Sequence, residues 1–381
     1  MQFPRALSLP ELLKAKSAFL FGPRSSGKTV LYESQLKPNR VYDLLSSQTF
    51  RRLSQNPSLV FEECLGQGEL IVIDEVQKLP EILDEVHRTI QKKKARFLLT
   101  GSSARKLKKS EANLLGGRAS SLEMFPLTSS EIGNIDLLRF FRRGGIPRHY
   151  LCEENQLSSE MDDYVHLYLK EEILQEAVTR NLEGFSRFLE IMALHSGDEL
   201  SIESFSSDCA VKGNTFRNYI EVLKDTLIGF EVPAFSQTKK RKAITRSKFF
   251  LFDVGLSNHL SGRIVTPHKN EVYGRSMEHF IAMELRSYLK YNKRKEALCY
   301  WRSTSQFEVD FLVGDTLAIE VKSTSSVSEH HLRGLRAIGE EKIFKSLICV
   351  ADVPLERVVE DIKVMPWRIF LEKLWSGELL K

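Results

Sequence analysis

The sequence is poor in cysteine and contains no long apolar run. Its five cysteines are odd in number, widely spaced and never arranged as a CxxC pair. This pattern excludes a disulfide framework and a cysteine-rich zinc site, and it is typical of a reducing compartment. The N-terminal segment lacks the apolar stretch of a signal peptide, and no segment approaches the roughly 18 apolar residues of a membrane helix. We therefore expect a soluble, cytoplasmic protein without a membrane partner.

A strong excess of one charge is also missing. The formal net charge is +5 over 381 residues, with 42% hydrophobic and 28% charged residues. This balance is typical of a globular chain, and it permits a nucleic-acid partner without requiring one. At roughly 100–200 residues per domain, the length predicts two to four domains.

The strongest local pattern is a phosphate-binding loop. An apolar stretch at residues 18–21 leads into "GPRSSGKT", and a helical pattern follows. In the order strand, GxxxxGK[ST], helix, backbone N–H groups and a helix N-terminus bind phosphate oxygens. A chance match is the alternative, and the flanking strand and helix argue against it. We expect ATP to contact Gly22, Pro23, Arg24, Ser25, Ser26, Gly27, Lys28, Thr29 and Val30.

Two acidic residues follow a later apolar strand, in "ELIVIDEV". Lys28 supplies positive charge for the β- and γ-phosphates, and the Thr29 hydroxyl is a ligand for Mg²⁺. Asp74, at the end of a buried strand, would hold the same Mg²⁺ through water. Glu75 is then placed to act as general base on an attacking water. A helix N-cap is the alternative role for an acidic residue at this position.

A third strand and a glycine pair add two further candidates. The segment "FLLTGSS" ends in hydroxyl side chains, of which Ser102 would orient the attacking water or sense the γ-phosphate. Arg118 follows two glycines in "GGRA" and would act as an arginine finger on the nucleotide of a neighbouring subunit. That role implies a homo-oligomer. An ordinary surface arginine is the alternative.

Seven segments spread along the chain carry a family resemblance: "GPRSSGKT", "LIVIDEVQKLP", "FLLTGSS", "GGRA", "FPLTSSEI", "GGIPRHYL" and "YVHLYLKEEI". They are similar to segments of the AAA+-like P-loop ATPases of bacteria and archaea that carry a C-terminal domain of unknown function. The resemblance implies an α/β core that hydrolyses ATP with Mg²⁺ through Lys28, Thr29, Asp74 and Glu75. It also implies a helical lid that includes residues 144–145 and 164–173.

The middle of the chain predicts a winged helix-turn-helix. A short helix over residues 203–210, a glycine-containing turn and a longer helix over residues 215–226 fit that motif. Asn214 would be the N-cap of the second helix. The side chains that begin this helix would then lie where base-reading residues usually sit, namely Thr215, Arg217 and Asn218.

A basic run follows the predicted second helix. Residues 237–248 contain six basic residues and no acid. Their apolar flanks predict a β-hairpin wing that binds DNA phosphates, so that affinity would depend strongly on salt. A solvated hairpin used only for packing is the alternative.

The C-terminal part pairs two carboxylates across a predicted hairpin. Gly314 and Asp315 mark a tight turn between two apolar strands. Side chains alternate along a strand, so Glu320 and Lys322 share a face, roughly opposite Asp310. Mg²⁺ bound by Asp310 and Glu320 would relieve the repulsion between these two carboxylates.

An upstream helical carboxylate completes a second pattern. Glu278 lies on the core-facing stripe of a helix predicted over residues 273–292, where an unpaired carboxylate is unfavourable. The four residues Glu278, Asp310, Glu320 and Lys322 form a pattern: a helical Glu, then an Asp, then Glu-x-Lys about ten residues later. This pattern resembles the catalytic residues of restriction-endonuclease-like nucleases. The resemblance implies metal-dependent DNA cleavage by these four residues. The alternative is a domain that keeps the fold for binding and has lost cleavage.

Together these patterns predict an α/β protein of several parts. Residues 1–135 would form the AAA+-like P-loop core and 136–185 its helical lid, followed by a winged helix-turn-helix (186–262) and a restriction-endonuclease-like α/β domain (263–381). The leading hypothesis is an ATPase that acts on, or is regulated by, DNA, with ATP and Mg²⁺ as cofactors. One alternative is an ATP-gated switch with an inactive C-terminal binding module. The other is an ATPase that remodels a protein partner.

Overall fold

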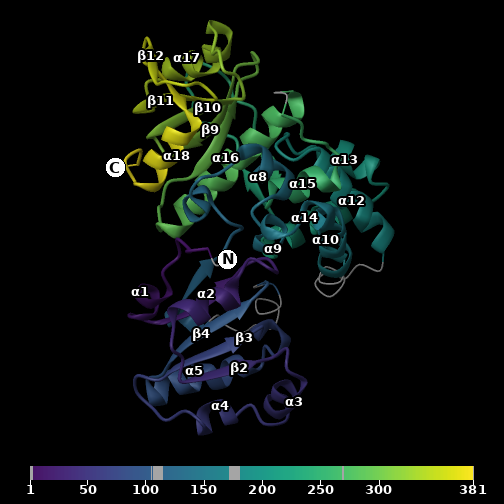
Figure 1. Ribbon diagram of the computed structural model, residues 1–381, viewed down its shortest axis with the longest axis vertical. Helices are drawn as coiled ribbons and strands as arrows, with labels where there is room; N and C mark the ends of the chain where they lie inside the picture. The colour runs from purple at the N-terminus through teal and green to yellow at the C-terminus, as the bar shows by residue number, and fades with distance from the viewer. Residues whose placement is uncertain (1–2, 104, 106–114, 171–180, 268–269, 381) are drawn as a thin grey trace.

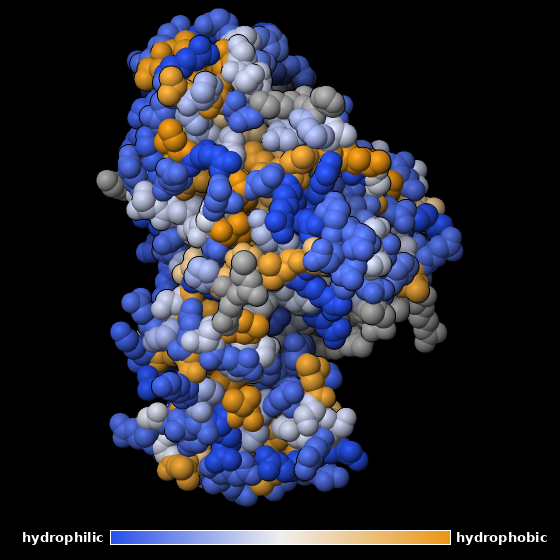
Figure 2. All heavy atoms as spheres, viewed as in Figure 1, coloured by the Kyte–Doolittle hydropathy of each residue, from blue (hydrophilic) through white to orange (hydrophobic). Residues whose placement is uncertain are grey.

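The molecule has a sheet at each end and helices between them. The computed structural model describes residues 3–103, 105, 115–170, 181–267 and 270–380. Figure 1 shows the N-terminal sheet at one end and the C-terminal sheet at the other, with the helices of the middle part beside the second sheet. The face drawn in Figure 2 is mostly hydrophilic, with apolar residues scattered over it. Within the described residues, no helix is both long enough and apolar enough to cross a membrane.

Five parallel strands form the N-terminal sheet in the order β2-β3-β4-β1-β5. Side chains alternate between the two faces of a strand. In β1, Phe19 packs in one hydrophobic cluster and Leu20 in another, so both faces of the sheet are buried. Parallel sheets require such cover on both faces. The strands are β1 (Ser17–Phe21), β2 (Arg40–Asp43), β3 (Leu70–Asp74), β4 (Arg96–Gly101) and β5 (Ala119–Glu123).

Helices cover both faces of this sheet. The apolar stripe of α5 (Ile82–Lys93) packs in the cluster that contains Phe19. On the other face, α1 (Leu9–Leu13) and α2 (Lys28–Gln35) pack in the cluster that contains Leu20. Because α2 begins at Lys28 directly after the glycine-rich loop, the predicted order of strand, loop and helix is confirmed. Two further helices are α3 (Ser47–Gln55) and α4 (Leu59–Glu62).

Short helices follow β5, in the region where a helical lid is predicted. They are α7 (Ser129–Ile132), α8 (Leu137–Arg143), α9 (Pro147–Leu151), α10 (Leu157–Asp163) and the π-helical η4 (Tyr164–Lys170). After α8 the chain turns at Gly144, whose φ is +70°, and a Cβ there would lie 1.9 Å from Asp253 Oδ1. The buried Asp253 carboxylate accepts a hydrogen bond from Gly145 N at 2.7 Å. Only glycine therefore fits at position 144. Residues 171–173 of the predicted lid helix lie outside the described residues.

The two predicted helices of the middle part are confirmed, with one error in detail. They are α13 (Ile202–Asp208) and α14 (Gly213–Asp225), which pack on α12 (Leu182–Leu194) around Phe188 and Phe216. The prediction that Asn214 is the N-cap is wrong, because Lys212 holds the extended backbone of the N-cap and the helix begins at Gly213. The Asn214 Oδ1 atom instead accepts from Arg217 Nη1 at 3.1 Å.

The predicted wing differs from the structure in where its basic residues lie. Strands β6 (Gly229–Val232) and β7 (Lys248–Leu251) pair antiparallel, but residues 233–247 form an irregular connection between them. This connection forms isolated bridges to the C-terminal part, Ala234 with Tyr300 and Ala243 with Ser303. Contacts of apolar side chains with a C-terminal hydrophobic cluster hold the connection there. The basic run is therefore not a free hairpin.

The C-terminal part is a six-stranded sheet in the order β12-β13-β11-β10-β9-β8, packed on a long helix, α16 (Glu271–Tyr291). The predicted hairpin is confirmed, because β9 and β10 pair antiparallel with Ile319 opposite Phe311. The strands are β8 (Leu298–Arg302), β9 (Glu308–Val313), β10 (Leu317–Lys322), β11 (Ser346–Ala351), β12 (Arg357–Val359) and β13 (Ile362–Pro366). Helices α17 (Arg333–Gly339) and α18 (Trp367–Trp375) complete this part, and α15 (Val254–Leu260) precedes it.

One hydrophobic cluster joins the middle of the chain to the C-terminal sheet. It includes Phe140 and Phe141 of α8, Phe280 of α16 and Ile319 of β10. The rings of Phe140 and Phe280 lie 5.0 Å apart. Because α16 packs on α8 on one side and on the sheet on the other, it lies at the centre of this shared core.

Candidate functional sites

The phosphate loop is shaped by close backbone contacts. Gly22 N donates to Gly101 O at 3.2 Å, and a Cβ at Gly22 would lie 2.6 Å from Met124 O. Gly27 has a φ of +95°, in the left-handed region where glycine is favoured. The buried Lys28 Nζ donates to the carbonyl oxygens of Gly22 at 2.7 Å and Pro23 at 3.0 Å. The loop thus wraps around the lysine ammonium group.

A hydroxyl and a carboxylate meet beside the loop. Thr29 Oγ1 donates to Asp74 Oδ2 at 3.2 Å, although the two residues are 45 positions apart in the chain. Asp74 Oδ1 accepts from Glu75 N at 3.1 Å and from the Thr100 hydroxyl at the end of β4. Strand β4 lies between β1 and β3, so the ends of three strands converge here. Hydroxyl and carboxylate oxygens are ligands that suit Mg²⁺, so this pair fits the predicted ion.

Glu75 and Ser102 are linked by a glutamine that the sequence analysis missed. Gln77 Nε2 donates to Glu75 Oε2 at 2.5 Å and to Ser102 Oγ at 3.0 Å. Glu75 has a left-handed backbone, with a φ of +58°, which is uncommon for a residue with a side chain. A Cβ at Gly101 would lie 2.3 Å from Gln77 Oε1, so only glycine leaves room for this amide. The two predicted residues therefore share one hydrogen-bonding partner.

The other predicted residues of the loop differ in their surroundings. The Arg24 guanidinium lies 5.5 Å from the centre of the Tyr168 ring, and Tyr164 OH donates to Arg24 O at 3.1 Å, so η4 touches the loop. Val30 is 48% exposed. Arg118 is exposed after two glycines with positive φ, and its role on a neighbouring subunit stays a prediction.

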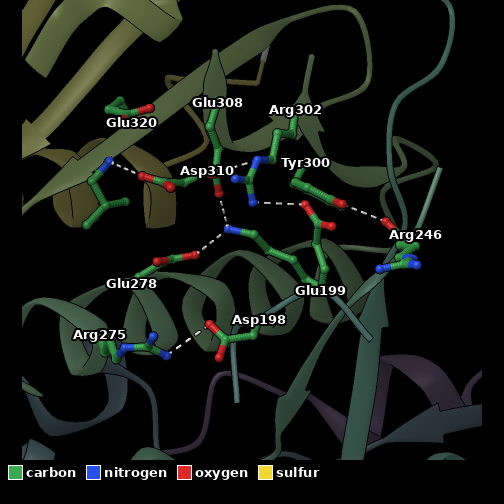
Figure 3. A network of polar contacts seen from close by, with 12 residues as sticks. Asp198, Glu199, Arg246, Arg275, Glu278, Tyr300, Arg302, Glu308, Asp310 and Glu320 are labelled. Carbon is green, nitrogen blue, oxygen red and sulfur yellow. Dashed lines mark hydrogen bonds and ion pairs between the residues drawn. The ribbon is translucent and has the colours of Figure 1, made fainter. Parts of the chain in front are cut away.

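A second group of charged residues lies where α16, β7 and β9 meet (Figure 3). Lys248 Nζ lies 2.9 Å from Glu278 Oε1 and 2.7 Å from Glu308 Oε1. The lysine is 5% exposed, so these two carboxylates replace most of the water that would otherwise surround its ammonium group. Burial raises the pKa of Glu278 to about 7, although the ammonium group lowers it. The predicted cost of an unpaired Glu278 is thus offset by a lysine that we expected on the surface.

Asp310, Glu320 and Lys322 lie together, as the hairpin predicts. Val321 N donates to Asp310 Oδ2 at 2.7 Å, and Lys322 Nζ lies 2.5 Å from Glu320 Oε1. Burial, followed by the charge of Asp310, raises the pKa of Glu320 well above its usual value. Glu320 Oε2 is buried and accepts no hydrogen bond from the described residues. Such a carboxylate oxygen is suited to a cation.

Other charged side chains around this group form ion pairs with residues of opposite charge. A cavity of about 450 Å³ opens beside Lys248 and Glu278. On its walls, Arg275 Nη1 lies 2.9 Å from Asp198 Oδ1 and Arg302 Nη1 lies 3.1 Å from Glu199 Oε1. In the part of the chain that the structure describes, no three His, Cys, Asp or Glu side chains gather as a metal site. A cation at Asp310 and Glu320 would therefore have two carboxylate ligands, which is sufficient for Mg²⁺.

The predicted DNA-binding residues are partly exposed. Arg217 and Asn218 are exposed near the start of α14, and Thr215 is half-buried. In the basic run, Arg241 binds Glu340 Oε2 at 3.0 Å and is half-buried against the C-terminal part. Four other basic side chains of this run are exposed, namely Lys239, Lys240, Lys242 and Arg246.

Three models of protein families match successive parts of the chain. Residues 14–133 match a family model described as an AAA domain. Residues 134–265 and 273–370 match two domains of unknown function, DUF8612 and DUF4143. The AAA match, together with the parallel sheet and the phosphate loop, supports an AAA+-like P-loop ATPase core. The other two matches carry no function, so the winged helix and the nuclease-like domain stay predictions.

Over most of its length, the chain is also similar to individual proteins. An uncharacterized protein of Mycobacterium tuberculosis is 28% identical over 329 residues, which cover 83% of this chain and 72% of the relative. An uncharacterized protein of Methanocaldococcus jannaschii is 23% identical over 335 residues, which cover 80% of this chain and 73% of the relative. A solved structure of the Aeropyrum pernix Orc1 protein in complex with DNA is 14% identical and covers 67% of this chain and 90% of that chain. The TM-score of this match is 0.29.

Proposed function

We propose that the protein binds ATP with Mg²⁺ at the phosphate loop and hydrolyses it. One observation carries this proposal. Lys28 begins α2 directly after the loop that follows β1, and the Thr29 hydroxyl beside it contacts the Asp74 carboxylate at 3.2 Å. Positive charge, backbone amides, a hydroxyl and a carboxylate are the groups that a magnesium–nucleotide complex requires.

Each residue of the site has a separate role in this proposal. Lys28 binds the β- and γ-phosphates, and Thr29 and Asp74 would hold Mg²⁺, which neutralises phosphate charge. Glu75 accepts a proton from the attacking water. Gln77 keeps the Glu75 carboxylate in place through its 2.5 Å hydrogen bond and connects it to Ser102. Arg118 would complete the site from a neighbouring copy in a homo-oligomer.

Two substitutions separate binding from hydrolysis. Lys28→Ala removes the charge that faces the phosphates, so we expect ATP binding to be lost in calorimetry. Glu75→Gln keeps the size of the side chain but removes the base, so binding should persist while turnover falls by about 100-fold or more. If the folded wild-type chain releases no heat with ATP and Mg²⁺, the proposal is wrong.

We further propose that nucleotide hydrolysis is coupled to DNA through the parts that follow. The exposed Arg217 and Asn218 at the start of α14 and the exposed lysines of the basic run favour this role. In this proposal residues 186–262 are a winged helix-turn-helix and residues 136–185 a lid. DNA should then stimulate ATP hydrolysis, and increasing salt should remove the stimulation. An ATPase that remodels a protein partner would show no stimulation.

A second candidate function is Mg²⁺-dependent DNA cleavage by the C-terminal part. It is supported by the proximity of Asp310, Glu320 and Lys322 and by the buried Glu320 Oε2 without a hydrogen-bonding partner among the described residues. Glu278, which reaches the same region from α16, would assist. Plasmid nicking that requires Mg²⁺ and disappears in both Asp310→Ala and Lys322→Ala would support it. Cleavage unchanged in Asp310→Ala would point to a contaminating nuclease, and no cleavage at all would favour an ATP-gated binding module.

A further inference from the structure

An arginine near the N-terminus is built into the phosphate loop. Arg5 precedes α1 and lies outside residues 14–133, which match the AAA domain. Its side chain is 8% exposed. Arg5 Nη1 donates to Ser26 O of the loop at 2.8 Å, and Nη2 donates to Phe125 O at 2.7 Å. Arg5 Nε donates to the Glu131 carboxylate at 2.9 Å. The guanidinium is thus held in one orientation by three acceptors.

The contact with Ser26 O determines the direction of a backbone amide. The carbonyl of Ser26 and the N–H of Gly27 belong to the same planar peptide group, and all described peptide bonds are trans. In a trans peptide the C=O and N–H bonds point in opposite directions. Because the Ser26 oxygen faces Arg5, the Gly27 N–H faces away from it. Gly27 has a φ of +95° and no side chain, so its own conformation restrains this peptide group only weakly.

We propose that Arg5 is a positioning residue that holds the Gly27 amide in the direction needed to bind a nucleotide phosphate. This inference rests on the proposed binding of ATP at the loop. An amide that is already oriented loses less conformational freedom when the phosphate binds, so the complex is tighter. Arg5 itself touches the loop from the side opposite the amide and is not a catalytic residue.

The anchors of Arg5 connect the loop to the C-terminal part. Arg5 Nη2 lies 3.5 Å from Tyr291 OH, and the same hydroxyl accepts from Phe125 N at 3.0 Å. Tyr291 is the last residue of α16. The orientation of the loop amide therefore depends in part on where the end of α16 lies.

Nucleotide affinity measured by calorimetry tests the proposal. In Arg5→Gln the Ser26 carbonyl loses its charged donor, so the Kd for ATP and for ADP should rise about tenfold. Arg5→Lys keeps the charge but reaches fewer acceptors, so the Kd should rise about threefold. Since the amide contacts phosphate in both the ground state and the transition state, the change should appear mainly in KM and little in kcat.

Arg96→Gln is the matched control. Arg96 also donates to a backbone carbonyl, Leu13 O at 2.9 Å, but it begins β4, at the end of the strand away from the phosphate loop. Its loss should lower the unfolding temperature without changing the Kd for nucleotide.

The possible outcomes distinguish a failure of the inference about Arg5 from a failure of the proposed function. If the wild type binds ATP and Arg5→Gln is folded and binds equally well, the inference about Arg5 is wrong while the proposed function stands. If Arg5→Gln does not fold, Arg5→Lys decides, because an unchanged Kd in that variant also overturns the inference. An equal rise of the Kd in Arg96→Gln would show that general loss of stability, and not the loop amide, explains the effect. If the wild type itself does not bind nucleotide, the proposed function fails first.

Discussion

Replacing Lys248 by methionine would test how the middle and C-terminal parts are held together. The ammonium group is 2.9 Å from Glu278 and 2.7 Å from Glu308, and the lysine is 5% exposed. Methionine keeps the length of the side chain but removes the cation between the two carboxylates, and Glu308 keeps only the longer contact of its Oε2 with Arg302 Nε at 3.8 Å among the described residues. Removing one partner of a buried ion pair costs about 3–5 kcal/mol. The side chains of Glu278 and Glu308 are 23% and 34% exposed, so water can reach them. We therefore expect a loss near the lower limit, about 3 kcal/mol.

The loss should also depend on pH. Burial raises the pKa of Glu278 to about 7 in the folded protein, and the Lys248 ammonium lowers it. Without the lysine this pKa rises further, so the carboxyl group stays protonated to higher pH. Because the pKa of Glu278 is higher in the folded than in the unfolded protein, its protonated carboxyl group favours the folded state. This contribution to stability is lost as pH rises through the folded pKa. The difference between wild type and Lys248→Met should be larger at pH 8 than at pH 6.

Urea unfolding followed by tryptophan fluorescence measures this loss. Lys224→Met is the matched control, because Lys224 also lies near two carboxylates, Glu221 at 3.0 Å and Glu231 at 3.2 Å, but its side chain is 35% exposed. Exposed pairs contribute about 0–1 kcal/mol, so the control should be nearly neutral. Equal losses in the two variants, or a loss in Lys248→Met that does not change between pH 6 and pH 8, would refute the reasoning.

Two further predictions follow from buried groups. Burial lowers the pKa of His279 to about 4, so protonation favours the unfolded chain; stability is full above the unfolded pKa and falls with decreasing pH until about pH 4. By pH 5 this residue should account for a loss of about 2 kcal/mol, and urea titrations of His279→Gln should show a correspondingly flatter pH dependence. Gly101→Ala would place a Cβ 2.3 Å from Gln77 Oε1 and displace the amide that holds Glu75. In steady-state assays kcat should fall about tenfold, whereas the Kd for ATP should stay close to that of the wild type.

The phosphate loop was predictable because its signal is local. Residues 22–29 carry the motif, and the strand and helix on either side follow directly in the chain. The contact between Thr29 and Asp74 required one more step, that strands of a parallel sheet end at the same edge. The hairpin of β9 and β10 was predictable for the same reason, since its turn and its alternating side chains are adjacent in sequence.

The residues that the sequence analysis missed act across long separations. Gln77 is close to Glu75 in the chain, but its importance comes from its contact with Ser102, which directly follows β4. Arg5 contacts Ser26, Phe125 and Glu131 only after the N-terminal segment folds against the sheet. No periodicity or motif marks such a residue, because its partners are set by tertiary packing.

Lys248 shows why the surroundings of the basic run could not be predicted from the sequence. A run of like charges indicates exposure, because most such residues remain in water. Here the connection over 233–247 crosses to the C-terminal sheet, and Lys248, the first residue of β7 after it, lies buried between acidic side chains. The sequence shows that this segment is positively charged, but it does not show where each of these side chains lies in the folded protein. An acidic partner such as Glu278, unfavourable on a core-facing stripe, was the signal that a buried cation had to be near.

Helix α16 is the element that relates the two candidate sites. Glu278 in its middle binds Lys248, Glu284 accepts from Ser129 N at 2.7 Å, and Tyr291 at its end accepts from Phe125 N. From Glu278 to Tyr291 a rigid helix spans roughly 20 Å at 1.5 Å per residue. A packed helix moves as a unit, so the end beside the phosphate loop and the turn beside the acidic group cannot shift independently. Any coupling through this helix must act equally in both directions, because the free energy that links two binding sites is reciprocal. If the two candidate sites are coupled through this helix, the C-terminal part would therefore act on the nucleotide site as strongly as the nucleotide site acts on it.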